Sequence, residues 1–302
     1  MKPELSFGKR LLLEVSWCAA KLFACLPHWF KYHVVAPLLY LMLCYCLRYR
    51  KRVVVENLEN AFPELTPEER QAIVRGFYRT LSELFVDMVN MAHMPRKKAL
   101  RVLKIKDAAQ HAEAVKGRDW IALSAHYACW EYSTYLGVHD PSQLLLAVYH
   151  PLKNAVAEQL MLRLRNTEAS EAIPMKESLR FNLRHRDEGI RGRNLVMGLI
   201  ADQSPPLRKG GFWTEFFHRE TMFFDGGEKL ALRCNLPVYF TRMKRLKAGI
   251  YEMSFEQLYD GVEQVEEYEI TRRYVEKLEE MIRQQPELWL WSHRRWKRKR
   301  PV

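Results

Sequence analysis

The sequence has 302 residues, of which 48% are hydrophobic and 12% aromatic, so it can bury a sizeable core and is not a disordered chain. This length suits one large α/β domain with an appendage. The formal charge of +12 and the pI of about 9.4 indicate an acidic partner, which leaves nucleic acid, an anionic membrane face, an acidic carrier protein or a phosphorylated substrate as candidates.

Residues 11–47 are the most apolar part of the chain. The run 11–26 carries Glu14 and Lys21, and the uncharged run 34–47 is shorter than the roughly 20 residues of a clean membrane span. Tryptophan and tyrosine along this region suit the membrane–water boundary, and the basic cluster 48–52 would hold that end on the cytoplasmic side. A pair of core helices is the alternative. We expect residues 1–58 to form apolar, membrane-anchoring helices, and residues 59–302 to form an α/β domain with a basic C-terminal tail.

A strong helix start follows at Thr66. Thr66 can serve as the N-cap, Pro67 suits the first turn, and Glu69 completes a capping box. Apolar residues then recur at helical spacing as far as Met88, which predicts a packing helix.

The stretch 120–137 predicts a buried strand that ends at Ser124 and is followed by His126, Glu131 and a helix. Residues five apart on a helix diverge by about 140°, so His126 and Glu131 can meet only if the loop turns back onto the helix start. A histidine that contacts a carboxylate there is a general base held in one tautomer. About one histidine of the ten would have an acid at this spacing by chance, so it is the strand exit that supports the pair. Cys129 could be a thiol nucleophile, but a small packing residue is the favoured interpretation.

Two further strands are predicted at 144–149 and 195–201, the first followed by a helix over 152–165. Arg165 lies near the end of that helix, where a cation also favours the helix dipole. Asp202 and Gln203 follow the second strand, and an acid there either contributes to a site or caps a turn.

The C-terminal third is aromatic and basic. We predict an aromatic stretch at 212–224 that lines the core or an acyl groove, a hairpin formed by 237–242 and 250–255, and an amphipathic helix over 271–285. Six of the eight residues from His293 to Arg300 are lysine or arginine, which is compatible with nucleic acid or with an anionic lipid surface. The cysteines lack zinc-site spacing, so we predict no metal site.

Several separated motifs occur in the order of one family over nearly the whole chain: Asn60-Ala-Phe-Pro-Glu64, His126-x4-Glu131, Tyr149-x-Pro151-x-x-Asn154, Arg165, Asp202-Gln203, Phe216-Phe217 and Trp291-Ser-His293-Arg-Arg-Trp-Lys297. The chain thereby resembles the bacterial lipid A biosynthesis acyltransferases, the late lauroyl/myristoyl transferases of the lysophospholipid acyltransferase superfamily.

The resemblance implies a glycerolipid-acyltransferase-like α/β fold in which helices flank a mixed central sheet. It also implies an enzyme at the cytoplasmic face of the bacterial inner membrane. Such an enzyme moves an acyl chain from acyl carrier protein, its co-substrate, to a hydroxyl of a lipid A precursor, with no further cofactor and no nucleic acid. His126 would be the general base and Glu131 its orienting partner. The substrate-binding residues would be Arg165, Asp202, Asn154 and Gln203.

Two positions depart from the family pattern. His150 stands where an arginine is usual, which bears on how a substrate phosphate is held, and His218 replaces a usual glycine beside the expected acyl groove. The acyl length is therefore open. Three alternatives also stay open: the same chemistry on a lysophospholipid, glycolipid or aminolipid acceptor, a hydrolase that passes the acyl group to water, and a basic nucleic-acid-binding protein.

Overall fold

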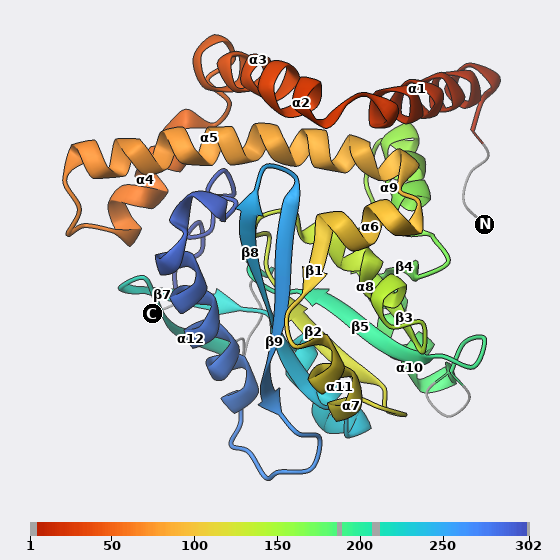
Figure 1. The fold of residues 1–302 in the computed structure, drawn as a ribbon. Coiled ribbons are helices and arrows are strands. Elements are labelled where there is room, and N and C mark those ends of the chain that lie inside the picture. Colours follow the sequence, from red (N-terminus) through yellow and green to blue (C-terminus); the bar gives the residue numbers. More distant parts are fainter. Residues whose placement is uncertain (1–4, 186–188, 207–211, 301–302) are drawn as a thin grey trace.

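The computed structural model describes residues 5–185, 189–206 and 212–300. Its centre is a curled seven-stranded sheet with the strand order β1-β9-β8-β2-β5-β3-β4, flanked by helices (Figure 1). Strands β8, β2, β5, β3 and β4 are parallel, whereas β9 is antiparallel to β8 and parallel to β1. The predicted α/β class with a mixed central sheet is confirmed.

The strands alternate with helices over most of the chain. The sheet consists of β1 (Leu103–Ile105), β2 (Trp120–Ser124), β3 (Gln143–Tyr149), β4 (Ser170–Pro174), β5 (Asn194–Ile200), β8 (Val238–Lys247) and β9 (Ile250–Tyr259). A separate antiparallel ribbon is formed by β6 (Phe212–Phe216) and β7 (Arg219–Phe223). The helices after the N-terminal region are α5 (Pro67–Asn90), α6 (Arg96–Val102), α7 (Ala108–Ala114), α8 (Leu136–His139), α9 (Ala155–Arg165), α10 (Ser178–His185), α11 (Gly226–Cys234) and α12 (Glu269–Gln284). Short helical turns η3 (Met91–His93), η4 (Trp130–Tyr135), η5 (Met175–Glu177) and η6 (Pro286–Leu288) connect them.

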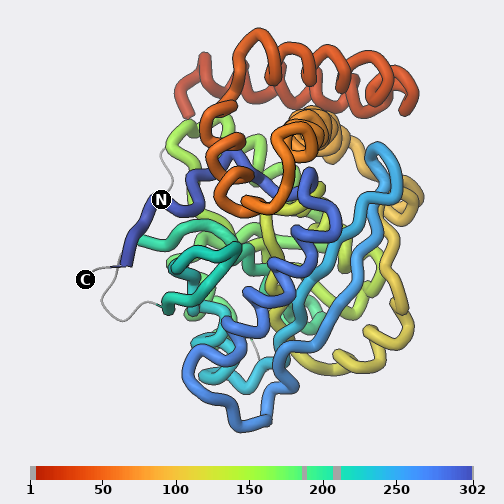
Figure 2. Tube along the Cα trace, turned by 90° about the vertical axis from the view of Figure 1, so that its left-hand side faces the viewer, coloured from red at the N-terminus to blue at the C-terminus, as the bar shows by residue number. Residues whose placement is uncertain are grey.

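The N-terminal helices form a layer on the outer side of α5 (Figures 1 and 2). This layer contains α1 (Phe7–Cys25) and a continuous helix, His28–Cys46, made of α2 (His28–Phe30), η1 (Lys31–Val35), α3 (Ala36–Leu41) and η2 (Met42–Cys46). Many large apolar side chains of the layer face outward, among them Phe7, Leu22, Trp29, Leu38 and Leu47, each more than half exposed.

Within the described part of the chain, His28–Cys46 is the one helix long and apolar enough to cross a membrane, by length and composition only. The sequence prediction of a run too short to span missed this helix because it starts six residues earlier, at His28, and continues through Pro37. A membrane anchor therefore has one candidate helix, and its insertion stays a prediction.

Helix α4 (Lys51–Ala61) joins this layer to the α/β domain. The predicted boundary at residue 58 falls inside it, and Val54 and Leu58 are fully buried in the main core. Helix α5 begins as predicted, because the Thr66 side chain accepts from the backbone of Glu69 while the Glu69 carboxylate accepts from the backbone of Thr66.

The predicted hairpin is also confirmed, as β8 and β9, and Gly249 turns between them with a φ of +68°. A Cβ atom at Gly249 would lie 2.2 Å from the hydroxyl of Tyr32, so the hairpin tip packs closely against the N-terminal layer.

The basic tail is only partly a surface. Trp291 is fully buried, and the guanidinium of Arg295 donates to the Met222 carbonyl (2.8 Å) and lies 4.2 Å from the Phe223 ring centroid. Burial lowers the pKa of Arg295 to about 10. The expectation of a uniformly exposed cationic tail is therefore wrong, because alternate tail residues pack into the core.

Candidate active site

His126 and Asp202 lie side by side at the carboxyl edge of the sheet. Strands β2 and β5 are parallel neighbours, and their last residues, Ser124 and Ile200, are paired in register. Each of the two site residues follows its strand end by two positions, so the register brings them together. The Nδ1 atom of His126 is 2.7 Å from Oδ1 of Asp202.

Asp202 is fully buried and accepts hydrogen bonds through both oxygens. Besides the imidazole, its Oδ2 accepts from the backbone N–H of His126 (3.1 Å) and from Nε1 of Trp289 (2.8 Å). Burial alone would raise the pKa of Asp202, but the attraction of His126 and these hydrogen bonds hold that pKa below its usual value. An ionised Asp202 fixes the imidazole proton on Nδ1, which leaves Nε2 as the basic nitrogen.

The basic nitrogen contacts Gln203, whose amide nitrogen is 3.2 Å from Nε2. With the proton on Nδ1, this amide donates to Nε2. The Trp130 ring covers another side of the imidazole, with ring centroids 5.0 Å apart at an angle of 70°. The side chain of His126 keeps 20% exposure, so Nε2 is the open end of a buried pair.

Glu131 has a different partner from the one predicted. Its carboxylate forms a two-pronged ion pair with Arg165, through Nε (2.9 Å) and NH2 (2.5 Å), and also accepts from Nε1 of Trp130 (3.1 Å). The carboxylate at the imidazole is therefore Asp202, which corrects the predicted contact between Glu131 and His126. The local spacing was misleading because the partner comes from a neighbouring strand.

The Glu131–Arg165 pair is buried. Desolvation would lower the pKa of Arg165, but the bonds with Glu131 raise it, so the guanidinium stays charged. The small cavity beside this pair has a volume of about 40 Å³, little more than a water molecule occupies. Arg165 and Glu131 thus hold η4, and with it the Trp130 wall of the site, against the end of α9. Whether Arg165 also binds substrate stays a prediction.

Asn154 caps a helix. Its side-chain oxygen accepts from the backbone N–H groups of Val156 (3.0 Å) and Ala157 (3.1 Å), which makes it the N-cap of α9. This local role accounts for the residue type at this position, and its predicted substrate contact is untested.

Cys129 is fully buried in the main core, and burial raises the pKa of its thiol well above the usual value. The favoured interpretation as a packing residue agrees with this position, since a buried neutral thiol is a poor nucleophile.

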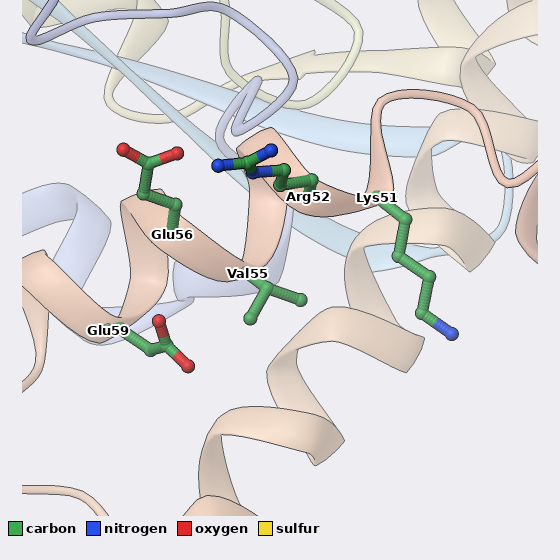
Figure 3. A pocket seen from close by; sticks show the side chains of 5 residues that line it. All are labelled: Lys51, Arg52, Val55, Glu56 and Glu59. Carbon is green, nitrogen blue, oxygen red and sulfur yellow. The ribbon is translucent and has the colours of Figure 1, made fainter.

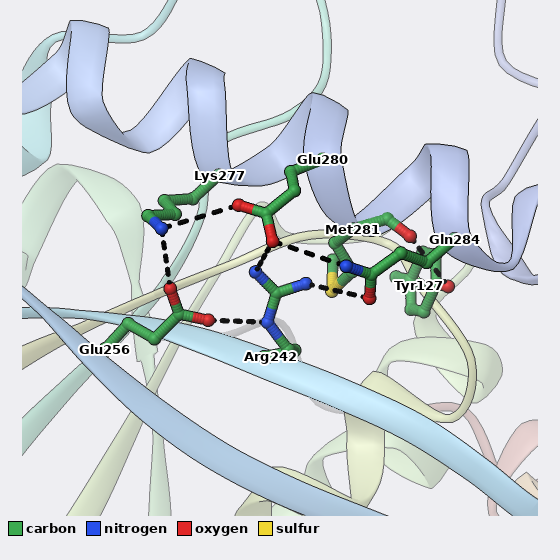
Figure 4. A network of polar contacts seen from close by, with 7 residues as sticks. All are labelled: Tyr127, Arg242, Glu256, Lys277, Glu280, Met281 and Gln284. Carbon is green, nitrogen blue, oxygen red and sulfur yellow. Dashed lines mark hydrogen bonds and ion pairs between the residues drawn. The ribbon is translucent and has the colours of Figure 1, made fainter.

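The loop that carries His126 is held by the C-terminal segment. The carbonyl of His126 accepts from Leu290 (3.0 Å), and the N–H of Ala128, whose φ is +52°, donates to Leu288 (2.9 Å). The Tyr127 hydroxyl lies at the end of α12 and donates to the Met281 carbonyl (3.2 Å), as Figure 4 shows. Sequence reasoning missed these supports, and Trp289 with them, because no local pattern relates residues so far apart in the chain.

A network of charged side chains fixes α12 itself on β8. Arg242 donates to Glu256 of β9 (2.5 Å) and to Glu280 of α12 (3.1 Å), and Lys277 pairs with Glu256 at 3.0 Å (Figure 4). The end of α12 that receives Tyr127 is therefore tied to the sheet.

A hollow of about 480 Å³ opens beside the basic nitrogen, and we call it the α5 hollow. Gln203 and Trp130, the two neighbours of the imidazole, line it, and one face of α5 supplies apolar side chains: Leu81, Leu84, Phe85 and Met88. Phe85 is 45% exposed there. Cations from elsewhere in the chain line the same hollow: Arg50, Arg294 and Lys297. An apolar face next to an imidazole base and a cationic edge suits an amphiphile with an acyl chain and a negative charge.

The fold and the site together define an enzyme that activates a hydroxyl next to an apolar groove at the edge of an α/β sheet. Comparison with known proteins specifies the family. The profile of bacterial lipid A biosynthesis acyltransferases matches residues 3–298, and the chain belongs to that family. It is 24% identical over 265 residues to the lipid A biosynthesis palmitoleoyltransferase of Escherichia coli (strain K12), a match that covers 85% of this chain and 81% of the relative. The lipid A biosynthesis acyltransferase of Shigella flexneri matches with the same identity and coverage.

Proposed function

We propose that this protein transfers a fatty acyl chain from the thioester of an acyl carrier protein to a hydroxyl of a lipid A precursor. We place it at the cytoplasmic face of the bacterial inner membrane, with the N-terminal layer against the lipid. The observation that carries the proposal is the pair of His126 and buried Asp202, which leaves a basic Nε2 beside the apolar α5 hollow. Family membership supports acyl transfer in lipid A biosynthesis.

His126 acts as the general base in this proposal. Its Nε2 takes the proton of the acceptor hydroxyl, and the alkoxide oxygen bonds to the thioester carbonyl carbon. The C–S bond then breaks, the ester carbonyl reforms, and the imidazolium returns the proton to the thiolate of the carrier. No covalent enzyme intermediate is needed, because a thioester is already an activated acyl donor.

Asp202 is the positioning residue of this step, since it holds the proton on Nδ1 and stabilises the imidazolium. Gln203 occupies Nε2 in the structure, so the acceptor hydroxyl has to displace its amide. The displaced amide N–H then lies close enough to donate to the oxygen that becomes negative as the alkoxide attacks. Glu131 and Arg165 act through Trp130, whose ring they fix beside the imidazole.

The test uses the purified full chain in detergent with an acyl carrier protein thioester and a lipid A precursor. We expect a product heavier by one acyl chain in mass spectrometry, and His126→Ala is expected to lose about 10² to 10⁴ in kcat. A parallel reaction without acceptor separates transfer from hydrolysis, and lysophospholipid or glycolipid acceptors test the alternative substrates. Wild-type turnover by His126→Ala would rule out the mechanism.

A further inference from the structure

A second hollow adjoins the α5 hollow. It has a volume of about 420 Å³, lies between α4, β7 and the C-terminal segment, and shares Arg294 and Lys297 with the first; we call it the α4 hollow. The two hollows are therefore contiguous, and one leads from the surroundings of His126 to the other.

The α4 hollow concentrates positive charge. Arg52, Arg219, Arg294 and Lys297 line it, and Glu56 is its one acidic lining residue. Among the described residues, Arg52, Arg294 and Lys297 are exposed and form no ion pair, whereas many other cations of this chain pair with glutamate. Cations that converge without an acid repel one another, and a bound anion would relieve that repulsion.

The opposite side of α4 differs in charge. Figure 3 shows Arg52 and Glu56 extending from one side of the helix and Lys51 and Glu59 from the other. The shallow groove that these four line together with Val55 has equal numbers of cations and acids, so it does not select for an anion.

The cations of the C-terminal segment sit on a fixed backbone. Asn57 of α4 donates to the carbonyls of Trp291 (2.7 Å) and His293 (2.9 Å), on one side of Arg294. Beyond Arg294, Nε1 of Trp296 donates to Thr221 (2.9 Å), and Arg219 lies 5.4 Å from the Trp296 ring centroid. A site whose backbone is held in this way needs little ordering when its ligand binds.

We propose that the α4 hollow binds a phosphate group of the lipid acceptor, with Arg52, Arg219, Arg294 and Lys297 as its ligands. This inference rests on the proposed function and extends it. Guanidinium groups and an ammonium group suit the oxygens of a phosphate, and the hollow has the size of a headgroup fragment, not of a protein face. A phosphate held there would lead the rest of the acceptor through the shared residues into the α5 hollow, towards Gln203 and His126.

The test compares two acceptors: a lipid A precursor that carries phosphate groups, and the same preparation after phosphatase treatment. The wild-type chain is expected to favour the phosphorylated acceptor in kcat/KM. In the double variant Arg294→Ala/Lys297→Ala this preference falls by about tenfold or more, because charge-assisted hydrogen bonds are lost. Lys299→Ala is the matched control: it removes an exposed lysine of the same segment that lines neither hollow, and it keeps the preference.

Binding is measured separately, as retention of each acceptor in mixed micelles by the His126→Ala variant with and without the two further substitutions. Loss of phosphate-dependent binding in the triple variant supports the site even if no acceptor is acylated, in which case the proposed function alone fails. An unchanged acceptor preference in the double variant overturns the site while transfer persists. A rise in KM for the carrier-bound donor with that preference unchanged also overturns it, because the surface would then receive the carrier protein.

Discussion

Replacing Asp202 by asparagine tests the partner that the structure gives to His126. The carboxylate accepts from three donors: Nδ1 and the backbone N–H of His126, and Nε1 of Trp289. An asparagine has only one oxygen. If that oxygen faces Nδ1, the amide group points at the other two donors, and each buried donor left without an acceptor costs about 1–3 kcal/mol.

The reverse orientation costs less, because the oxygen then accepts from the backbone of His126 and from Trp289. The amide group faces Nδ1 in that case, so Nδ1 has to be the acceptor and the imidazole proton moves to Nε2. The basic nitrogen is thereby blocked. We expect Asp202→Asn to lose about 10² to 10⁴ in kcat, the range of general-base help, with little change in the KM of the acceptor.

The assay is single-turnover acyl transfer with excess enzyme, so that product release does not hide the chemical step. Circular dichroism and acceptor binding control for folding. Turnover within a factor of about three of wild type would refute the reasoning, since it would mean that the tautomer of His126 does not matter.

The remaining predictions concern stability and are read from unfolding in detergent. Glu131→Gln strands a buried guanidinium and is expected to cost about 3–5 kcal/mol, much of it recovered in the double variant Glu131→Gln/Arg165→Met; a loss of kcat with unchanged stability would instead indicate direct orientation of His126. Burial raises the pKa of Asp87 to about 7, so the folded state holds its proton more tightly than the unfolded chain. Stability should therefore fall as pH rises from about 4 through about 7, and Asp87→Asn should flatten this dependence in Tm measurements. Gly249→Ala adds a Cβ atom at a positive φ against Tyr32 and should destabilise the chain by about 1–3 kcal/mol, whereas an unchanged Tm would refute the tight contact.

Elements specified by local chemistry were predictable from the sequence. The capping box at Thr66 and the run of apolar residues in β2 each carry their signal within a few residues. The helix predicted from residue 152 starts at Ala155 instead, because the side chain of Asn154 caps it. Boundaries shift in this way when one hydrogen bond decides where the helix begins.

The site was predictable only in part. His126 and Asp202 could each be selected as polar residues at strand ends, but pairing them requires knowing that β2 and β5 are neighbours in register. The spacing of His126 and Glu131 suggested a contact that the fold does not make, because Glu131 compensates the charge of Arg165. Trp289 carries no local signal at all, although it bonds to the same carboxylate as the imidazole.

These contacts also bear on whether the two predicted parts of the chain can exist apart. Arg50 donates to the Ser292 carbonyl (2.9 Å), and Asn57 holds the carbonyls on either side of it. Two residues before Trp291, Trp289 bonds to Asp202, so the path from the start of α4 to the catalytic pair crosses only a few hydrogen bonds. Residues 1–58 therefore support the segment that orients the base. Since the same segment carries the cations of the α4 hollow, the N-terminal helices, the anion-binding surface and the catalytic pair are expected to fold as one unit.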